Sequence, residues 1–268
     1  MDSPLRWIGA GLILLVLAAS WIAWGFQNDM QTGRARVAQG AKLIDTPCGP
    51  IEYQEAGAGV PLLAVHGSGG GHNHGMAFAG SLAQRGMRVI AMSRFGYLRT
   101  PMPARRAGHF TRCCHGLLGR RPIGLSDGHS TSRSGDRVPE SAPPMPPWFE
   151  ALATPLELVT KASAQEQAWV AAMLNNILPV SARVQGLKSD TAVGKHLGPS
   201  PLASVHAPTI TFSARHDRYG TYASARYTAS QIVGARFIGY DEGGHALVGH
   251  DDEVMAEVAR LLVPQANP

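Results

Sequence analysis

The chain reads PLLAVHGSGGG from Pro61 to Gly71, and this stretch decides the fold. Its first five residues form a short apolar run, and a glycine-rich segment follows directly. A short apolar run bounded by glycines is typical of a buried parallel strand. The loop His66-Gly67-Ser68-Gly69 exposes backbone N–H groups of the kind that stabilise an oxyanion. We therefore expect a buried strand that ends in a loop of exposed amides.

Strand and helix patterns alternate around this stretch. Residues 41–55 predict a hairpin with its turn at Cys48-Gly49-Pro50. Phe78 to Arg85 has a helical pattern, and Met87 to Met92 forms a second short apolar run. Such alternation indicates an α/β sheet.

The same alternation returns toward the C-terminus. Trp148 to Leu178 has a helical pattern, which we interpret as part of a cap over residues 145–200. Residues 209–213 and 236–240 predict strands. Asp251 to Leu262 predicts a final amphipathic helix, with acids in its first turn, where the helix dipole favours them.

Three polar residues occur in the order Ser, Asp, His at or after predicted strands. Gly124-Leu125-Ser126-Asp127-Gly128 fits a tight turn that presents a serine nucleophile, because its glycines leave room beside the serine. Asp217 follows the strand at 209–213, and His245 follows the strand at 236–240 in a glycine-rich loop. Protein folds that use a Ser, an Asp and a His for nucleophilic catalysis differ in the order of these three residues along the chain. The order Ser, Asp, His therefore carries information about the fold as well as about the reaction.

Each candidate also has a plainer interpretation. Ser126 is a loop serine if Arg120-Arg121-Pro122-Ile123, a poor buried strand, does not pair in the sheet. Independently of Ser126, the alternative for Asp217 is an ordinary turn aspartate, and the alternative for His245 is a histidine of a surface loop. Asp241 and Glu242 are alternative carboxylate partners for the histidine.

Metal and redox chemistry are the rival interpretations of two other clusters. His66, His72 and His74 lie close together in the sequence, but no nearby carboxylate completes a metal site. The three cysteines are Cys48, Cys113 and Cys114. An odd number without a CxxC motif predicts neither a disulfide framework nor a zinc ribbon, and adjacent cysteines fit disulfide geometry poorly. We expect no metal and no cofactor.

The segment 104–144 interrupts the pattern and carries most of the net charge. It has little apolar periodicity, and between Ala104 and Glu140 seven arginines face three acids, which gives 7 − 3 = +4 of the total +5. Because the excess is local and no basic stripe with interleaved aromatics occurs, we expect no nucleic-acid partner. We hypothesise that the segment is partly out of frame or was replaced by insertion and deletion, which the coding DNA would decide.

The N-terminal segment is long enough to span a bilayer. Trp7 to Gly25 is apolar apart from Ser20 and uncharged, and at about 1.5 Å per residue it reaches about 28 Å, close to the hydrocarbon thickness of about 30 Å. We expect residues 1–26 to be an uncleaved single-span membrane anchor, followed by a linker at 27–40 and the catalytic domain at 41–268. A cleaved signal peptide is the alternative. Under both interpretations we expect the catalytic domain to be extracytoplasmic.

These motifs together resemble the α/β-hydrolase family. The resemblance covers about Ala41 to Pro103 and Trp148 to Leu262. The segments that carry it are TPCGPIEY at 46–53, the His66-Gly67 loop, SRFGYL at 93–98, SARHD at 213–217 and GGH at 243–245. The segment between the two covered parts departs from the family's pattern.

The resemblance implies an α/β-hydrolase fold, with a mostly parallel central sheet and a helical cap. It implies a serine hydrolase that cleaves an ester or related acyl bond of a small-molecule substrate without a cofactor. Ser126 would be the nucleophile, His245 the base and Asp217 its orienting acid, while the backbone amides of Ser68 and Asp127 would form the oxyanion hole. The alternatives are a non-catalytic relative in which the turn at Ser126 does not form, and a lyase or peroxidase on the same fold.

Overall fold

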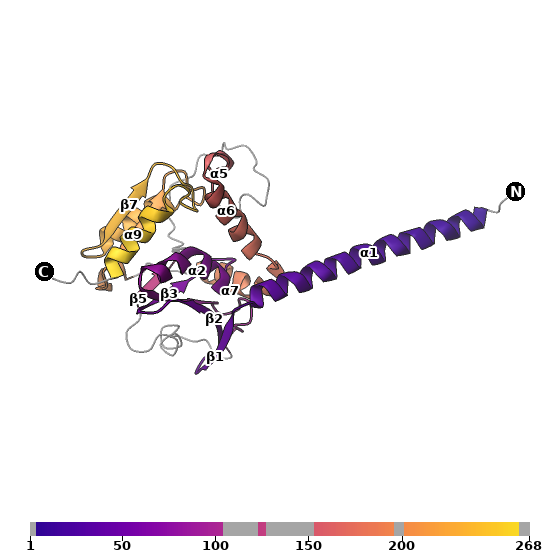
Figure 1. The fold of residues 1–268 in the computed structure, drawn as a ribbon, viewed down its shortest axis with the longest axis horizontal. Coiled ribbons are helices and arrows are strands. Elements are labelled where there is room, and N and C mark those ends of the chain that lie inside the picture. The colour runs from indigo at the N-terminus through magenta and orange to yellow at the C-terminus, as the bar shows by residue number, and fades with distance from the viewer. Residues whose placement is uncertain (1–3, 104–122, 127–152, 196–200, 263–268) are drawn as a thin grey trace. The chain divides into compact units, whose positions relative to one another are not determined.

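The computed structural model describes residues 4–103, 123–126, 153–195 and 201–262 (Figure 1). It separates into two units, residues 1–40 and 41–268. The boundary falls at the start of the predicted catalytic domain.

The first unit consists of helix α1, Pro4–Ala38, which is unbroken in Figure 1. The helix continues through residues 27–38, which we expected to be a linker. Extending an existing helix needs no new nucleus, so a polar segment can continue one that an apolar segment has begun. In the part of the chain that the structure describes, one helix is long and apolar enough to cross a membrane, from Trp7 to Ala38; an N-terminal signal sequence would have the same character.

The second unit contains a five-stranded sheet with the order β1-β2-β4-β3-β5. Its strands are β1 Lys42–Thr46, β2 Gly49–Ala56, β3 Val60–Val65, β4 Met87–Met92 and β5 Ile123–Ser126. The β1–β2 and β2–β4 pairs are antiparallel, whereas β3 is parallel to both β4 and β5. The strands β3 and β4 match the apolar runs of the sequence because they lie in the interior of the sheet, where both faces are covered.

The first hairpin turns at Pro47 and Cys48, one position earlier than predicted. Gly49 and Pro50 already belong to β2, and Gly49 pairs with Thr46. The Thr46 hydroxyl stabilises this turn by accepting from the Cys48 N–H at 3.1 Å and donating to the Gly49 carbonyl at 2.7 Å. Cys48 is disulfide-bonded, which the odd cysteine count did not predict; the other two cysteines of the chain lie outside the described residues.

A second, two-stranded parallel sheet is formed by β6, Ile210–Ala214, and β7, Arg236–Tyr240. The sequence predicts one central sheet, and in the described part of the chain no strand joins β5 to β6. Both sheets nevertheless contribute to one hydrophobic core, in which Leu62 and Ala64 of β3 cluster with Ala214 and Tyr240. Helix α9, Asp251–Leu262, adds an apolar face to this core, while α8, Thr221–Gln231, packs against β6 and β7.

Helix α2, His72–Ala79, begins six residues before the predicted helix, directly after the glycine run, and packs against β4 and β3. It continues as the 3₁₀ helix η1, Gly80–Arg85, so the predicted segment is only partly α-helical.

The cap consists of short helices rather than one long helix. They are α5 Leu156–Lys161, α6 Ala164–Asn176, η2 Val180–Ala182, α7 Val184–Gly194 and η3 Leu202–Ser204. The predicted helix is interrupted at Ser163, whose side chain accepts from the Glu166 N–H while the Glu166 side chain accepts from the Ser163 N–H. Such a reciprocal cap begins a new helix. The predicted irregular segment 104–144 falls outside the described residues except for β5.

Candidate active site

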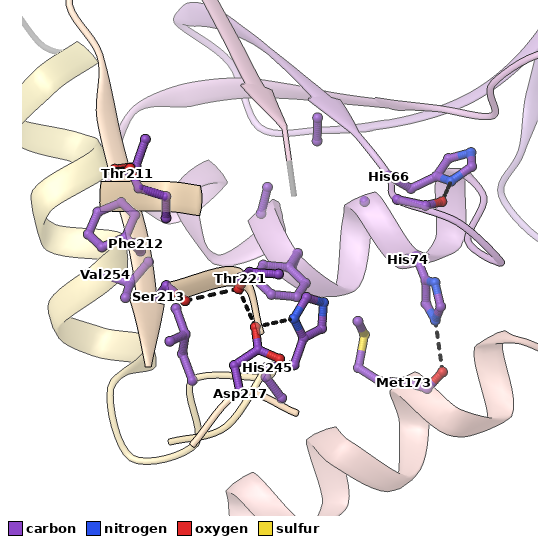
Figure 2. Close-up of a pocket in the computed structure, with 18 of the residues that line it drawn as sticks. His66, His74, Met173, Thr211, Phe212, Ser213, Asp217, Thr221, His245 and Val254 are labelled. Carbon is purple, nitrogen blue, oxygen red and sulfur yellow. Dashed lines mark hydrogen bonds and ion pairs between the residues drawn. The ribbon is translucent and has the colours of Figure 1, made fainter. Parts of the chain in front are cut away.

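Asp217 and His245, which are 28 positions apart in the sequence, form a hydrogen-bonded pair. The His245 Nδ1 atom lies 2.9 Å from Asp217 Oδ2 (Figure 2). The loop after β6 carries the aspartate, and the loop after β7 carries the histidine. Because β6 and β7 are parallel neighbours, both loops leave the same edge of their sheet. A carboxylate bonded to Nδ1 favours the tautomer with a proton on that nitrogen and a lone pair on Nε2.

The Asp217 carboxylate is buried and has three donors. Besides His245, the Thr221 hydroxyl donates to Oδ2, and the Tyr219 N–H donates to Oδ1 at 2.8 Å. The Thr221 hydroxyl in turn lies 2.9 Å from that of Ser213 on β6. Burial by itself would raise the pKa of Asp217, but the interactions with His245, Thr221 and the Tyr219 amide hold that pKa below its usual value. Asp217 therefore remains an anion that orients the imidazole.

The backbone around His245 requires glycine. Gly244 has φ +63°, and a Cβ there would meet the Cα of Thr154 at 2.7 Å. The His245 N–H donates to the Ala153 carbonyl at 3.4 Å, and the Ala246 N–H donates to the Thr154 hydroxyl at 3.0 Å. The segment 153–154 before the cap therefore fixes the histidine loop.

The alternative acids Asp241 and Glu242 do not replace Asp217. Asp241 forms an ion pair with Arg215 at 2.9 Å, and the side chains of Asp241 and Glu242 are both exposed. The edge of the Tyr219 ring packs against the His245 ring, with centroids 4.8 Å apart.

His66 at the start of the glycine loop has a structural role. Its Nδ1 lies 2.6 Å from the Gly67 carbonyl, and its Nε2 accepts from the Arg94 N–H at 3.0 Å. Burial, reinforced by the nearby charge of Arg94, lowers the pKa of His66 well below its usual value. The ring also contacts the loop tightly, because a Cβ on Gly70 would approach it within 2.9 Å.

The other two histidines of the rival metal site face different groups. His74 Nε2 lies 2.8 Å from the Met173 carbonyl, whereas His72 Nε2 lies 3.6 Å from Glu52 Oε1, beyond hydrogen-bond distance. Among the residues that the structure describes, no three metal-ligating side chains gather into a cluster.

Three residues to which the sequence analysis gave no role in the site, Asp190, Arg94 and Tyr97, hold Ser68 and its neighbour in place. Asp190 of α7 accepts from the Ser68 hydroxyl at 2.7 Å, from Arg94 Nη2 at 2.5 Å and from the Tyr97 hydroxyl at 2.5 Å. The Tyr97 hydroxyl also accepts from the Gly69 N–H at 3.4 Å. Burial, together with the hydrogen bond to Asp190, raises the pKa of Tyr97 to about 12, so its hydroxyl stays protonated at neutral pH.

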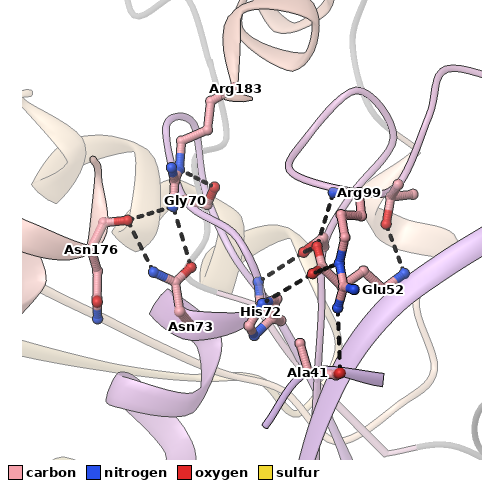
Figure 3. A network of polar contacts seen from close by, with 10 residues as sticks. Ala41, Glu52, Gly70, His72, Asn73, Arg99, Asn176 and Arg183 are labelled. Carbon is pink, nitrogen blue, oxygen red and sulfur yellow. Dashed lines mark hydrogen bonds and ion pairs between the residues drawn. The ribbon is translucent and has the colours of Figure 1, made fainter. Parts of the chain in front are cut away.

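A second group that the sequence did not reveal lies beneath the loop and includes the buried carboxylate of Glu52. It accepts from Arg99 Nε at 2.6 Å and from the Arg99 N–H at 2.9 Å, with His72 beside it (Figure 3). The Ser93 hydroxyl, which accepts from the His72 N–H at 3.1 Å, connects this group to the first turn of α2. The end of the glycine loop is thereby attached to the sheet.

Ser126 is the last residue of β5. Its backbone pairs with Val65, the last residue of β3 and the residue before His66. Neighbouring strands lie about 4.8 Å apart, so the backbone of Ser126 is adjacent to the start of the glycine loop. The Ser126 side chain and the whole of Asp127 fall outside what the structure describes.

One cavity of about 290 Å³ joins these elements (Figure 2). Its polar wall includes Asp217, His245, His66, Gly67 and Ser68. Apolar side chains from α2, α6, β6 and α9 form much of the remainder: Phe78, Trp169, Met173, Phe212, Val254 and Met255. A mainly apolar cavity with a few converging polar groups is typical of a small-molecule site.

Comparison with known proteins identifies the fold as that of the α/β-hydrolases. An α/β-hydrolase fold protein from Nakamurella multipartita matches 83% of this chain and 98% of its own, with 23% identity and a TM-score of 0.60. An enol-lactonase from Burkholderia xenovorans LB400 matches 82% and 99%, with 15% identity and a TM-score of 0.57.

A bacterial membrane phospholipase A matches 95% of this chain and 99% of its own, with 16% identity and a TM-score of 0.56. No family model and no curated protein matches the sequence. The chain therefore has the α/β-hydrolase fold that the motifs predict, with mostly parallel strands and a helical cap, and the identities are too low to show more than the fold.

Proposed function

We propose that this protein is a serine hydrolase that cleaves an ester or a related acyl bond. The observation that carries the proposal is that one cavity contains both the Asp217–His245 pair and the loop at Gly67 and Ser68. The backbone of Ser126 ends its strand beside that loop. Base, orienting acid, exposed amides and a serine at a strand end are the components of acyl transfer to a serine.

In the proposed reaction, Ser126 Oγ attacks the substrate carbonyl carbon while His245 Nε2 takes the hydroxyl proton. The carbonyl oxygen becomes an oxyanion, and the N–H groups of Ser68 and Asp127 donate to it. His245 then returns the proton to the leaving alcohol as the acyl–oxygen bond breaks. Water, deprotonated by the same imidazole, releases the acyl group as an acid and restores Ser126. Asp217 stabilises the imidazolium in both steps.

The cavity favours an apolar acyl group. Its volume is about 290 Å³, about twice the roughly 150 Å³ cavity that holds a benzene-sized molecule. Aromatic and aliphatic side chains form much of its lining, so burial of an apolar group there gains about 25 cal/mol per Å². The similarity to an enol-lactonase and a phospholipase A agrees with ester chemistry.

We further propose that α1 is a membrane anchor and that the catalytic domain lies outside the cytoplasm. The apolar part of α1 has the length of a span, and the match to a membrane phospholipase A extends over 95% of the chain. The disulfide at Cys48 supports an oxidising compartment. Sedimentation of the full chain with membranes after carbonate washing tests the anchor. Digestion of the domain by protease added to intact cells tests its side, and recovery in the soluble fraction would contradict the anchor.

The function is tested by labelling the full chain with a fluorophosphonate probe and mapping the modified peptide. We expect an adduct on Ser126 that is absent in Ser126→Ala and strongly reduced in His245→Ala. Ser163→Ala is the matched control, because this serine only caps α6. A folded wild-type protein without an adduct would reject the proposal and favour a non-catalytic α/β-hydrolase fold protein.

A further inference from the structure

A carboxylate of the cap holds the glycine loop at Ser68. Asp190 Oδ2 accepts from three donors, the Ser68 hydroxyl and the side chains of Arg94 and Tyr97, all within 2.7 Å. Tyr97 is fully buried and also accepts from the Gly69 N–H. One side chain of α7 is therefore connected to two consecutive residues of the loop.

Helix α7 is itself firmly placed on the segment that follows β4. The Gly186 N–H donates to the Gly96 carbonyl at 2.9 Å, and the Leu98 N–H donates to the Ala182 carbonyl at 2.8 Å. The two glycines touch so closely that a Cβ on Gly96 would lie 2.6 Å from the Gly186 nitrogen, and one on Gly186 would overlap the Tyr97 ring. This close approach fixes the distance between α7 and the segment after β4, and hence the position of the Asp190 carboxylate.

A second cap residue holds the opposite end of the loop. Arg183, fully buried just before α7, donates through Nε to the Gly70 carbonyl at 3.0 Å and through Nη2 to the Asn176 carbonyl at 2.5 Å (Figure 3). Asn73 on α2 donates to the same Asn176 carbonyl at 3.0 Å. The cap thus holds the loop both at Ser68 and at Gly70.

We propose that Asp190 is a positioning residue that aims the Ser68 backbone N–H at the oxyanion, so that the placement of the cap controls the reactivity of the site. The inference rests on the proposed function, because it assigns a purpose to the loop in that reaction. Hydroxyl and N–H groups held in one geometry before reaction lower the barrier more than groups that must reorganise, and an error of about 1 Å can cost about 100-fold in rate. Asp190 touches neither His245 nor Asp217 in the described contacts; it acts through Ser68 and Gly69.

The test compares Asp190→Ala and Asp190→Asn with wild type in two measurements on the full chain. The first is hydrolysis of a p-nitrophenyl ester, and the second is hydrogen exchange of the peptide that covers residues 66–71. For Asp190→Ala we expect kcat to fall about 10- to 100-fold, with KM changed less than about threefold, and faster exchange in that peptide. Asp190→Asn keeps one acceptor oxygen in the same shape, so it should restore part of the rate. Lys188→Ala, an exposed position on the same helix, is the matched control and should leave both measurements unchanged.

The outcomes separate this proposal from the proposed function. If wild type hydrolyses the ester and Asp190→Ala exchanges at 66–71 like wild type, the positioning role is wrong. Equal losses of kcat in Asp190→Ala and Lys188→Ala would overturn it too. If wild type shows neither hydrolysis nor a fluorophosphonate adduct, the proposed function is wrong, and the positioning role of Asp190 in that reaction is rejected with it, whatever the exchange shows.

Discussion

The two walls of the cavity are built in different ways. On the acid–base wall, the Asp217 carboxylate is held by groups at positions 219 and 221 and by one histidine 28 residues away. On the loop wall, Ser68 contacts a residue 122 positions away, and Gly70 contacts one 113 positions away. The Asp217 carboxylate is therefore held mainly by its own turn and by one histidine loop, which the segment 153–154 supports, whereas the loop wall exists only when the cap and the sheet have both formed.

The largest expected effect on activity comes from a substitution at Asp217, at the centre of the acid–base wall. Asp217→Asn removes the negative charge that orients His245 and stabilises its protonated form, so kcat should fall by about 10³- to 10⁴-fold. Steady-state ester hydrolysis measures this. The fold should persist, since the side-chain shape is kept, and circular dichroism checks it. A loss of less than tenfold would mean that Asp217 does not orient the base.

A substitution beneath the loop wall should lower the stability of the fold more than it lowers the activity. Glu52→Gln leaves Arg99 without its buried carboxylate, and because Arg99 is half exposed and regains water, we expect the free energy of unfolding to fall by about 2–3 kcal/mol rather than more. Chemical denaturation measures it. Glu55→Gln on the same strand is the control: its ion pairs with Lys42 and Arg88 lie at the surface, so the loss should stay below about 1 kcal/mol. Equal losses would contradict a special role for the buried acid.

Alanine substitutions at two glycines near His245 distinguish the cost of backbone strain from the cost of a steric clash. Gly244→Ala forces a methyl group into Thr154 at a positive φ, whereas Gly249→Ala, with φ +89°, meets nothing within 4 Å. Backbone strain alone costs about 1–2 kcal/mol, so Gly249→Ala should lower the free energy of unfolding by about that much. Gly244→Ala should lower it by about 1–2 kcal/mol more and should also reduce ester hydrolysis. Thermal unfolding monitored by circular dichroism measures both. If the two variants behave alike, the contact between Thr154 and the histidine loop does not matter.

The smallest expected effect is a pH dependence of the stability that Asp217 in the acid–base wall contributes. The pKa of Asp217 is lower in the folded protein than its ordinary value, so its stabilising contribution is fully present above about pH 4 and is lost as the pH falls through the folded value. The difference in unfolding free energy between wild type and Asp217→Asn should therefore stay constant above about pH 4 and narrow below it. Denaturation at several pH values measures it. A constant difference would mean that the carboxylate contributes no more as an anion than as an acid.

The contrast between the walls also explains what the sequence could predict. The strands at 87–92 and 236–240 and the helix at 251–262 have the predicted bounds, because apolar runs and helical periodicity are local properties. The sequence singled out Asp217 and His245 for the same reason, since each follows a strand, and the structure brings the two side chains together. The assignment of Asp217, His245, Ser126, Asp127 and Ser68 to the reaction stays a prediction.

What the sequence missed depends on contacts between distant segments. Asp190 lies in a polar helix face, and Glu52 lies in an ordinary edge hairpin; neither has a local pattern that distinguishes it from a solvated acid. The extension of α1 beyond residue 26 was missed because polar composition was taken as a sign of a linker, although a helix already formed propagates through such residues. The break in the cap at Ser163 did have a local signal, the serine followed three residues later by a glutamate.

The tight packing of His66 has a consequence for enzymology. Three histidines line the described cavity, and in two of them, His66 and His74, burial lowers the pKa, so both stay uncharged in the neutral range. Neither His66 nor His74 should then contribute a charged imidazole to the pH–rate profile of the site, although both line the cavity.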